Sequence, residues 1–282
     1  MAQVSKKTIN VRGDLVDLTE PCIMGIVNFT PDSFFENSRV NSHQEVVDRV
    51  GLMQEQGARM IDVGGYSTRP GALEVSVENE LDRVLAMVEP IKKNFSNLII
   101  SVDTFRSQVA RAAVQAGADI INDVSGGILD PLMFDAVADL GVPYILMHMR
   151  GTPATMAQLT DYDNLVVDII RELKGKVEEL RSKGVTDIII DPGFGFAKTI
   201  SQNFELLRDM AEFKQLGYPI LAGLSRKATI YKTLNITATE ALNGTTVLNT
   251  LALERGASIL RVHDVKEAVE TVKLWQATQR IN

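Results

Sequence analysis

Residues 184–191 read Gly184-Val-Thr-Asp-Ile-Ile-Ile-Asp191, a glycine followed by an apolar run that stops at a carboxylate. A glycine in this place is typical of a helix C-cap, because left-handed backbone carries no steric penalty without a Cβ. The branched apolar run is typical of a strand buried on both faces. The pattern therefore predicts a helix end, a buried strand and a polar side chain at the carboxyl end of that strand.

The same pattern recurs along the chain and indicates the fold. It begins at a glycine in residues 57–62, 117–123, 141–148, 217–227 and 256–261. Two more apolar runs, residues 22–28 and 98–103, lack the glycine but end at Asn28 and Asp103. Between these strands, apolar residues at helical spacing in 81–91 and 165–180 predict amphipathic helices.

Eight strands alternating with helices favour parallel pairing and right-handed crossovers, and so a closed (β/α)8 TIM barrel. The 282 residues suit that fold, which takes about 250 residues. No linker or low-complexity tract interrupts the pattern, so we expect one domain over residues 1–282. Residues 9–18 alternate around Gly13, which predicts a β-hairpin. We expect this hairpin to close the bottom of the barrel.

Composition restricts the partners and the compartment. The net charge of −7 argues against a nucleic-acid partner, which needs a basic face. No apolar run approaches the roughly 20 residues of a membrane span, and the N-terminus has no apolar signal region. The single cysteine, Cys22, excludes an internal disulfide and is expected to be a buried hydrophobe. We therefore expect a cytoplasmic protein with no membrane partner.

Polar side chains at the strand ends should meet at one mouth of the barrel, where α/β-barrel enzymes place their chemistry. Acidic and amide groups there could bind a metal, act as bases or accept hydrogen bonds from a ligand, and some could instead cap the following helix. They are Asp62, Asp103, Asn122, Asp123 and Asp191.

Cations stand beside these acids and suggest a ligand with an anionic part, although each could instead form a salt bridge with a neighbouring acid. They are Lys227, Arg261 and His263, with Arg69 in a loop. In Asp191-Pro-Gly-Phe-Gly-Phe196, two phenylalanines beside a carboxylate suit an aromatic heterocycle. His148 is expected to be packed and hydrogen-bonded rather than catalytic, and His43 to lie on the surface.

The longer motifs resemble those of the dihydropteroate synthase family, in that family's order and over nearly the whole chain. Residues 24–34, Met-Gly-Ile-Val-Asn-Phe-Thr-Pro-Asp-Ser-Phe, and 62–71, Asp-Val-Gly-Gly-Tyr-Ser-Thr-Arg-Pro-Gly, resemble its first two loops. Ser-Val-Asp-Thr at 101–104, Ile-Asn-Asp at 121–123, Met-His-Met at 147–149, the 191–196 motif, Leu-Ser-Arg-Lys at 224–227 and Arg-Val-His-Asp-Val at 261–265 follow.

This resemblance implies the joining of 4-aminobenzoate to a dihydropterin methyl diphosphate, with release of diphosphate, by a Mg²⁺-dependent enzyme that is commonly a homodimer. It implies catalytic roles for Asp103, Lys227, Arg261 and His263. The implied residues for the pterin diphosphate are Thr68, Asp103, Asn122, Asp191, Lys227, Arg261, Val262 and His263. Those implied for the aminobenzoate are Phe34, Thr68, Arg69, Pro70, Phe196 and Ser225, and Asn28 is implied as the metal ligand.

Some residues depart from the family pattern, and two other functions stay open. Tyr66 stands where the family commonly has Glu, and residues 35–39 and 242–245 also differ. A methyltetrahydrofolate-dependent corrinoid methyltransferase would share the pterin-binding acids but would need neither the two loop motifs nor a diphosphate site. A pterin-binding barrel without activity is the other alternative, but Asp103, Lys227 and Arg261 are all present.

Overall fold

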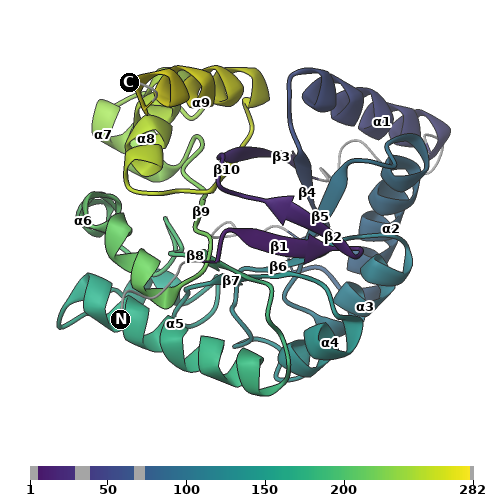
Figure 1. Cartoon of the computed structure of the whole chain (residues 1–282), viewed down its shortest axis with the longest axis horizontal. Helices are drawn as coiled ribbons and strands as arrows, with labels where there is room; N and C mark the ends of the chain where they lie inside the picture. Colours follow the sequence, from purple (N-terminus) through teal and green to yellow (C-terminus); the bar gives the residue numbers. More distant parts are fainter. Residues whose placement is uncertain (1–5, 29–38, 67–73, 280–282) are drawn as a thin grey trace.

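The computed structural model describes residues 6–28, 39–66 and 74–279, with the backbone alone for 39–42. Its centre is one sheet of eight parallel strands in the order β8-β7-β6-β5-β4-β3-β10-β9. A bridge between Ile190 of β8 and Ile220, the residue before β9, closes the barrel (Figure 1). The strands are β3 Cys22–Asn28, β4 Met60–Gly64, β5 Ile99–Asp103, β6 Ile120–Asp123, β7 Tyr144–Met147, β8 Ile188–Asp191, β9 Leu221–Ala222 and β10 Ile259–Val262.

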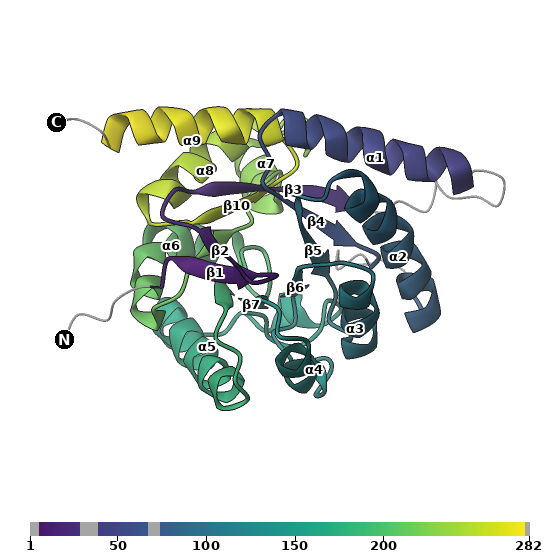
Figure 2. The same ribbon diagram turned by 45° about the vertical axis from the view of Figure 1, so that its right-hand side comes forward.

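All eight predicted strands are confirmed, and the helices between them form a ring around the barrel (Figures 1 and 2). They are α1 Arg39–Glu55, α2 Val77–Asn94, α3 Ser107–Gln115, α4 Met133–Leu140, α5 Leu165–Ser182, α6 Ile200–Arg208, α7 Ala228–Leu234, α8 Leu242–Glu254 and α9 Val265–Gln279, with short 3₁₀ segments Met156–Gln158 and Met210–Leu216. Among the described helices, none is long and apolar enough to cross a membrane.

The glycines of the repeated pattern have the backbone that their position predicts. All six, from Gly57 to Gly256, have φ between +64° and +111°. That left-handed backbone turns the chain from a helix into the next strand, and a residue with a Cβ would be strained there. The apolar face predicted for residues 165–180 is likewise buried along α5, against the outside of the barrel.

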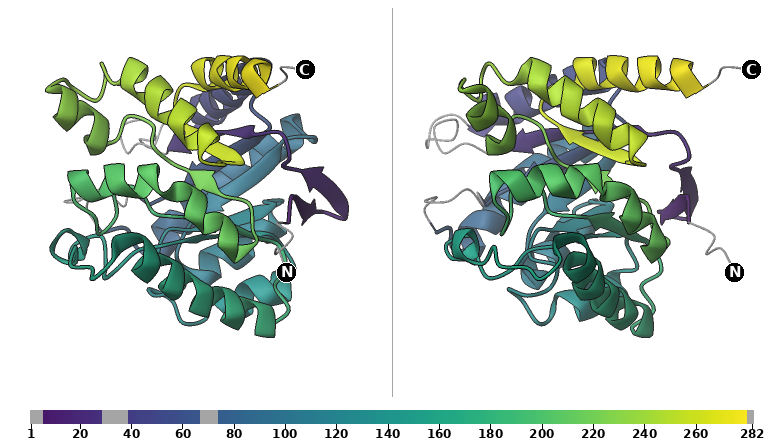
Figure 3. Two further views of the ribbon diagram at one scale, coloured as in Figure 1. Left: turned by 60° about the vertical axis from the view of Figure 1, so that its left-hand side comes forward. Right: turned by 90° about the vertical axis from the view of Figure 1, so that its left-hand side faces the viewer.

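An antiparallel hairpin, β1 Thr8–Val11 and β2 Asp14–Asp17, lies at one end of the barrel, where Figure 3 shows it in purple. Ile9 and Val11 pack on residues near the starts of the barrel strands, among them Met24 and Met60. Cys22 lies in this same cluster and is buried, as predicted, which raises the pKa of its thiol to about 12. The hairpin therefore closes the barrel bottom, as expected.

Ile9 is fully buried under the barrel, so Ile9→Ala should lower the free energy of unfolding by about 2–5 kcal/mol through lost burial and a cavity. Leu15→Ala, in the same hairpin but 74% exposed, should change it by less than about 0.5 kcal/mol. Urea unfolding of both variants measures the difference. Equal effects of the two substitutions would contradict a closing role for the hairpin.

Candidate active site

Arg261, on β10, reaches across the barrel mouth to two carboxylates. Its Nε donates to Asp62 Oδ2 at 2.6 Å, and its Nη2 donates to Asp103 Oδ2 at 2.9 Å. The three side chains come from β10, β4 and β5; Asp62 is fully buried, and Arg261 and Asp103 are 19% and 14% exposed. The expected convergence of strand-end groups is confirmed here, since residues up to 199 positions apart form one ion cluster.

Asp62 is the most enclosed member of this cluster, with no solvent exposure. Besides Arg261 it accepts from Ser101 Oγ at 2.6 Å and from Asn122 Nδ2 at 3.1 Å. Its carboxylate therefore fixes the orientation of Arg261 and Asn122, and it does not cap a helix.

Asp103 has an unusual protonation equilibrium. Burial raises its pKa to about 7, although Arg261 opposes that rise; the neighbouring Asp62 adds to it. The side chain can therefore change charge near neutral pH. A carboxyl of this kind beside a cation is typical of a functional site.

Asp191 and Lys227 lie close enough at the mouth for each to shift the pKa of the other, although no salt bridge joins them. Burial raises the pKa of Asp191, while Lys227 lowers it, and Asp191 Oδ1 accepts a hydrogen bond from Gly193 N at 2.7 Å. Burial lowers the pKa of Lys227 to about 8, against the attraction of Asp191. The ammonium of Lys227 donates to the Phe194 carbonyl and lies 5.1 Å from the centre of the Phe196 ring.

Ser225 and His263 lie together at the ends of β9 and β10. Ser225 Oγ accepts from the His263 backbone N–H at 3.2 Å and lies 3.1 Å from His263 Nδ1. The neighbouring Arg226 forms a bidentate salt bridge with Asp264, with hydrogen bonds of 2.9 and 2.8 Å. These contacts hold the two loops beside each other at the mouth.

The expectation for Phe194 is wrong, and the structure specifies the role of Asp123 and the part of Val262 that a ligand can reach. Asp123 accepts from Ser125 N, Gly127 N and Tyr144 OH, so it fixes the turn after β6 and does not face a ligand. Phe194 is fully buried, which leaves only Phe196 of the two rings partly exposed. The Val262 side chain packs among the buried residues between strands and helices, so only its backbone is available to a ligand.

Of the remaining candidate site residues, some lie in the described part of the chain and others lie outside it. Asn28 is exposed at the end of β3, where it pairs with Gly64, itself paired with Asp103. His43 is exposed and His148 is buried and hydrogen-bonded, as predicted. Phe34, Thr68, Arg69 and Pro70 lie outside the described residues.

Sequence reasoning missed the side chains that hold the loop after β8. Lys198 donates to two carbonyls of that loop, and Asn203 accepts from Gly195 N at 2.6 Å. Neither residue ends a strand, so the pattern that located the mouth does not include them. Their nearness to the Asp191 motif was the only available signal.

A barrel whose mouth combines buried carboxylates with Arg and Lys fits an enzyme for a polar, nitrogen-rich ligand, and comparison with known proteins specifies the class. A family model described as "Pterin binding enzyme" matches residues 24–263. The dihydropteroate synthase of Escherichia coli (strain K12) is 43% identical over 269 residues, which cover 95% of each chain.

Solved structures support the same family assignment. The dihydropteroate synthase of Xanthomonas albilineans with 4-aminobenzoic acid has a TM-score of 0.90 and 40% identity, covering 99% of this chain and 100% of the other. The same enzyme in complex with 7,8-dihydropteroate has a TM-score of 0.86 and 37% identity, covering 98% and 100%. The chain therefore belongs to the dihydropteroate synthases, transferases built on the TIM barrel. This membership favours the synthase over the methyltransferase and the inactive barrel.

The raised pKa of Asp103 predicts a stability change with pH. Because the folded-state pKa lies above the ordinary value of 3.8, stability from the protonated carboxyl is present below that value and is lost as pH rises to about 7. Asp103→Asn, which stays neutral, should therefore gain stability relative to the parent as pH rises from 4.5 to 8. The gain should shrink as pH falls toward 4.

Urea unfolding of both proteins at pH 4.5 and pH 8 measures this effect, and turnover at pH 8 should fall in the variant despite the gain. A variant that does not gain stability relative to the parent between these two pH values would show that the ion pair with Arg261 outweighs the burial of the carboxylate.

Proposed function

We propose that this chain condenses 4-aminobenzoate with (7,8-dihydropterin-6-yl)methyl diphosphate to give 7,8-dihydropteroate and diphosphate. The observation that carries the proposal is the pairing of acids and cations at one mouth: Arg261 between Asp62 and Asp103, and Lys227 beside Asp191. Such a mouth offers acceptors to the N–H donors of a pterin and cations to a diphosphate. The relatives' names and bound molecules support the same reaction.

The pterin is proposed to lie against Asp191, Asn122 and Lys227. A buried carboxylate can accept paired hydrogen bonds from the N–C–N edge of a pterin. Asp191 Oδ1 is held by Gly193 N, and Asn122 is oriented by its bond to Asp62, so both side chains are preorganised. Lys227 adds a donor beside them.

The diphosphate is proposed to contact Arg261, His263, Thr68 and the Val262 backbone. Arg261 uses Nε and Nη2 for the two carboxylates, and within the described part of the chain its Nη1 makes no hydrogen bond. That amino group can donate to phosphate oxygens, which guanidinium binds well.

A magnesium ion fits this mouth only with help from the substrate. The described residues contain no group of three or more His, Cys, Asp or Glu side chains that could hold a metal ion, and Asn28 contributes one exposed amide oxygen. Mg²⁺ commonly binds through one or two protein oxygens plus substrate phosphates and waters. Asn28 would hold the ion, which when bound would neutralise charge on the leaving diphosphate.

The aminobenzoate is proposed to bind where Phe196 and Ser225 face the mouth, with Phe34, Thr68, Arg69 and Pro70 of the two long loops. The half-buried Phe196 ring offers an apolar wall for an aromatic substrate. Ser225 offers a hydroxyl already fixed by the His263 backbone.

The proposed reaction needs charge stabilisation and no covalent help. The bond between the pterin methylene carbon and the diphosphate oxygen breaks, and both electrons leave with the diphosphate. A resonance-stabilised pterin cation remains, which the ionised form of Asp103 would stabilise electrostatically. The lone pair of the arylamine nitrogen then forms the new C–N bond, and the nitrogen loses one proton.

The direct test is turnover of the purified chain with Mg²⁺, 4-aminobenzoate and the dihydropterin diphosphate, following both products. Equal amounts of diphosphate and dihydropteroate, each requiring both substrates, are expected. Diphosphate without dihydropteroate would mean that water captures the cation. If neither product forms, the proposed reaction is refuted.

The two charge pairs predict a separable effect on binding. Asp191→Ala should weaken binding of a pterin without phosphates by about 100-fold or more, because a buried carboxylate that accepts its donors is lost. Arg261→Lys, which keeps a cation beside Asp62 and Asp103, should leave that binding within about threefold but raise KM for the diphosphate ester by about 10-fold or more. Calorimetry with both ligands, on variants checked for folding, measures the split, and equal effects on both ligands would refute this division of the site.

We also propose that two copies form a homodimer in the cytoplasm, where the single buried thiol of Cys22 stays reduced. Helices α7, α8 and α9 lie side by side on one flank (Figure 1). The α8 sequence carries no charge before Glu254, and Val247 and Leu251 on it are 51% and 43% exposed. An uncharged helix face with exposed apolar residues suits an interface between two copies.

Leu251→Lys should therefore shift the protein from dimer to monomer in light scattering, since a charge would be buried at the interface. Leu52→Lys, on α1 and 54% exposed, is the matched control and should leave the dimer intact. A monomeric parent protein at micromolar concentration would refute the proposal.

A further inference from the structure

The loop after β8 is held in place from outside the mouth by a buried lysine. Lys198 Nζ donates to Gly193 O at 3.0 Å and to Phe196 O at 2.9 Å, so one ammonium joins two points of the loop. Gly193 packs so closely on β7 that a Cβ there would lie 2.0 Å from the His148 carbonyl oxygen. The loop therefore has little freedom to move toward His148.

The third donor of Lys198 is also used. Its Nζ lies 3.0 Å from His148 Nδ1, and His148 Nε2 lies 3.0 Å from Glu172 Oε2. An ammonium only donates, so Nδ1 must accept, and the imidazole proton must be on Nε2, where it donates to the carboxylate. The three N–H groups of Lys198 thus meet three acceptors.

The pKa values of His148 and Glu172 favour the same assignment, and the ammonium form of Lys198 that it requires predominates below about pH 7. Burial lowers the pKa of His148 to about 4, so the ring is neutral at physiological pH. Glu172 is partly buried, which raises its pKa, but its contacts with His148 and Arg150 lower that pKa to about 2. The Glu172 carboxylate therefore stays ionised. Burial lowers the pKa of Lys198 to about 7, while Asp191 and Glu172 oppose that shift and Lys227 and Arg150 add to it.

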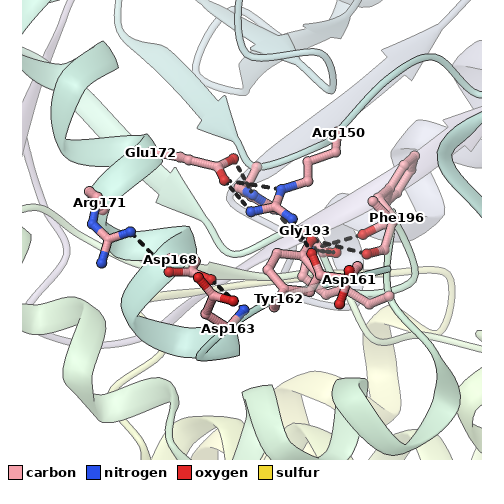
Figure 4. A network of polar contacts seen from close by, with 12 residues as sticks. Arg150, Asp161, Tyr162, Asp163, Asp168, Arg171, Glu172, Gly193 and Phe196 are labelled. Carbon is pink, nitrogen blue, oxygen red and sulfur yellow. Dashed lines mark hydrogen bonds and ion pairs between the residues drawn. The ribbon is translucent and has the colours of Figure 1, made fainter. Parts of the chain in front are cut away.

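Glu172 is itself clamped at the outer end (Figure 4). Arg150 donates to its Oε1 through Nε at 3.0 Å and Nη2 at 2.5 Å, and the guanidinium lies 3.9 Å from the centre of the Tyr162 ring. Tyr162 in turn donates to Ala197 O at 3.0 Å. Ala197 has φ +50°, a conformation that a residue with a Cβ keeps only when its surroundings enforce it.

The loop held in this way carries three groups of the proposed site. Gly193 N donates to Asp191, Phe194 O accepts from Lys227, and the Phe196 ring faces Lys227. A shift of Gly193 or Phe196 would therefore move the pterin acceptor, its neighbouring cation and the aromatic wall together.

We propose that Lys198 is a positioning residue for the synthase reaction, and that Glu172 and His148 act through it by fixing its three hydrogen bonds. This chain of three side chains sets the geometry of residues 191–196 and so the affinity for both substrates, without touching either one. The proposal rests on the proposed function for its kinetic readout but not for its spectroscopic one.

The spectroscopic test uses ¹⁵N NMR of the imidazoles, which is feasible because the chain has three histidines. At pH 6.5, His148 should be neutral with its proton on Nε2. A ring protonated on Nδ1, or one that carries a charge at this pH, would overturn the proposed chain of contacts. This result does not depend on which reaction the enzyme catalyses.

The kinetic test uses Lys198→Met, which keeps the length of the side chain and removes its donors. KM for 4-aminobenzoate and Kd for a pterin should each rise about 10-fold, the equivalent of about one hydrogen bond to a charged group, with kcat changed less than threefold. Lys92→Met is the matched control. Lys92 is a half-buried lysine on α2 that pairs with Asp119 at 3.8 Å and makes no contact with Lys198, His148 or Glu172, so both constants should stay near those of the parent.

Glu172→Gln provides a milder variant if Lys198→Met does not fold. An amide in that place no longer fixes the imidazole proton on Nε2, so a smaller rise in the same two constants is expected, together with a changed His148 spectrum. A folded Lys198→Met with unchanged KM and Kd would overturn the proposal, as would equal losses in the Lys92 control. Absence of turnover in the parent would instead refute the proposed function and leave the pterin Kd as the test.

Discussion

The mouth of this barrel depends on the electrostatic compensation of Arg261. A guanidinium among buried groups is tolerated only when carboxylates are close enough to offset its lost hydration. Asp62 and Asp103 provide that compensation from two other strands, so the register of β4, β5 and β10 and the charge cluster depend on each other. Asn122 and Ser101 complete the cluster by using the remaining acceptor capacity of Asp62.

The two carboxyl groups of this cluster differ in burial and in protonation. Asp62 has no exposure and several fixed partners, whereas Asp103 lies nearer the opening and has a pKa near 7. In the proposed reaction, an acid of the second kind would face the pterin while it carries delocalised charge. The first kind keeps that acid and the arginine in place, as electrostatic preorganisation requires.

The loop after β8 uses a different means of preorganisation. Its backbone is held by Lys198, Asn203 and Tyr162 from outside and by Lys227 from the mouth. A loop made of glycines and phenylalanines has few side chains to hold itself. Supporting hydrogen bonds from the surrounding helices and loops replace the sheet pairing that fixes Asp62 and Arg261.

The sequence by itself determined the barrel, its hairpin and the position of five side chains at the mouth: Asp62, Asp103, Asn122, Asp191 and Arg261. Periodicity and capping glycines are local properties, and parallel strands bring their carboxyl ends to one edge whatever the details of packing. Only the tertiary structure decided which way each strand-end side chain points: Asn122 faces Asp62, whereas Asp123 turns to Tyr144. It also decided that Lys198, His148 and Glu172 act together, because the contacts among these three side chains join residues 24 and 50 positions apart, and no local pattern encodes contacts at such separations.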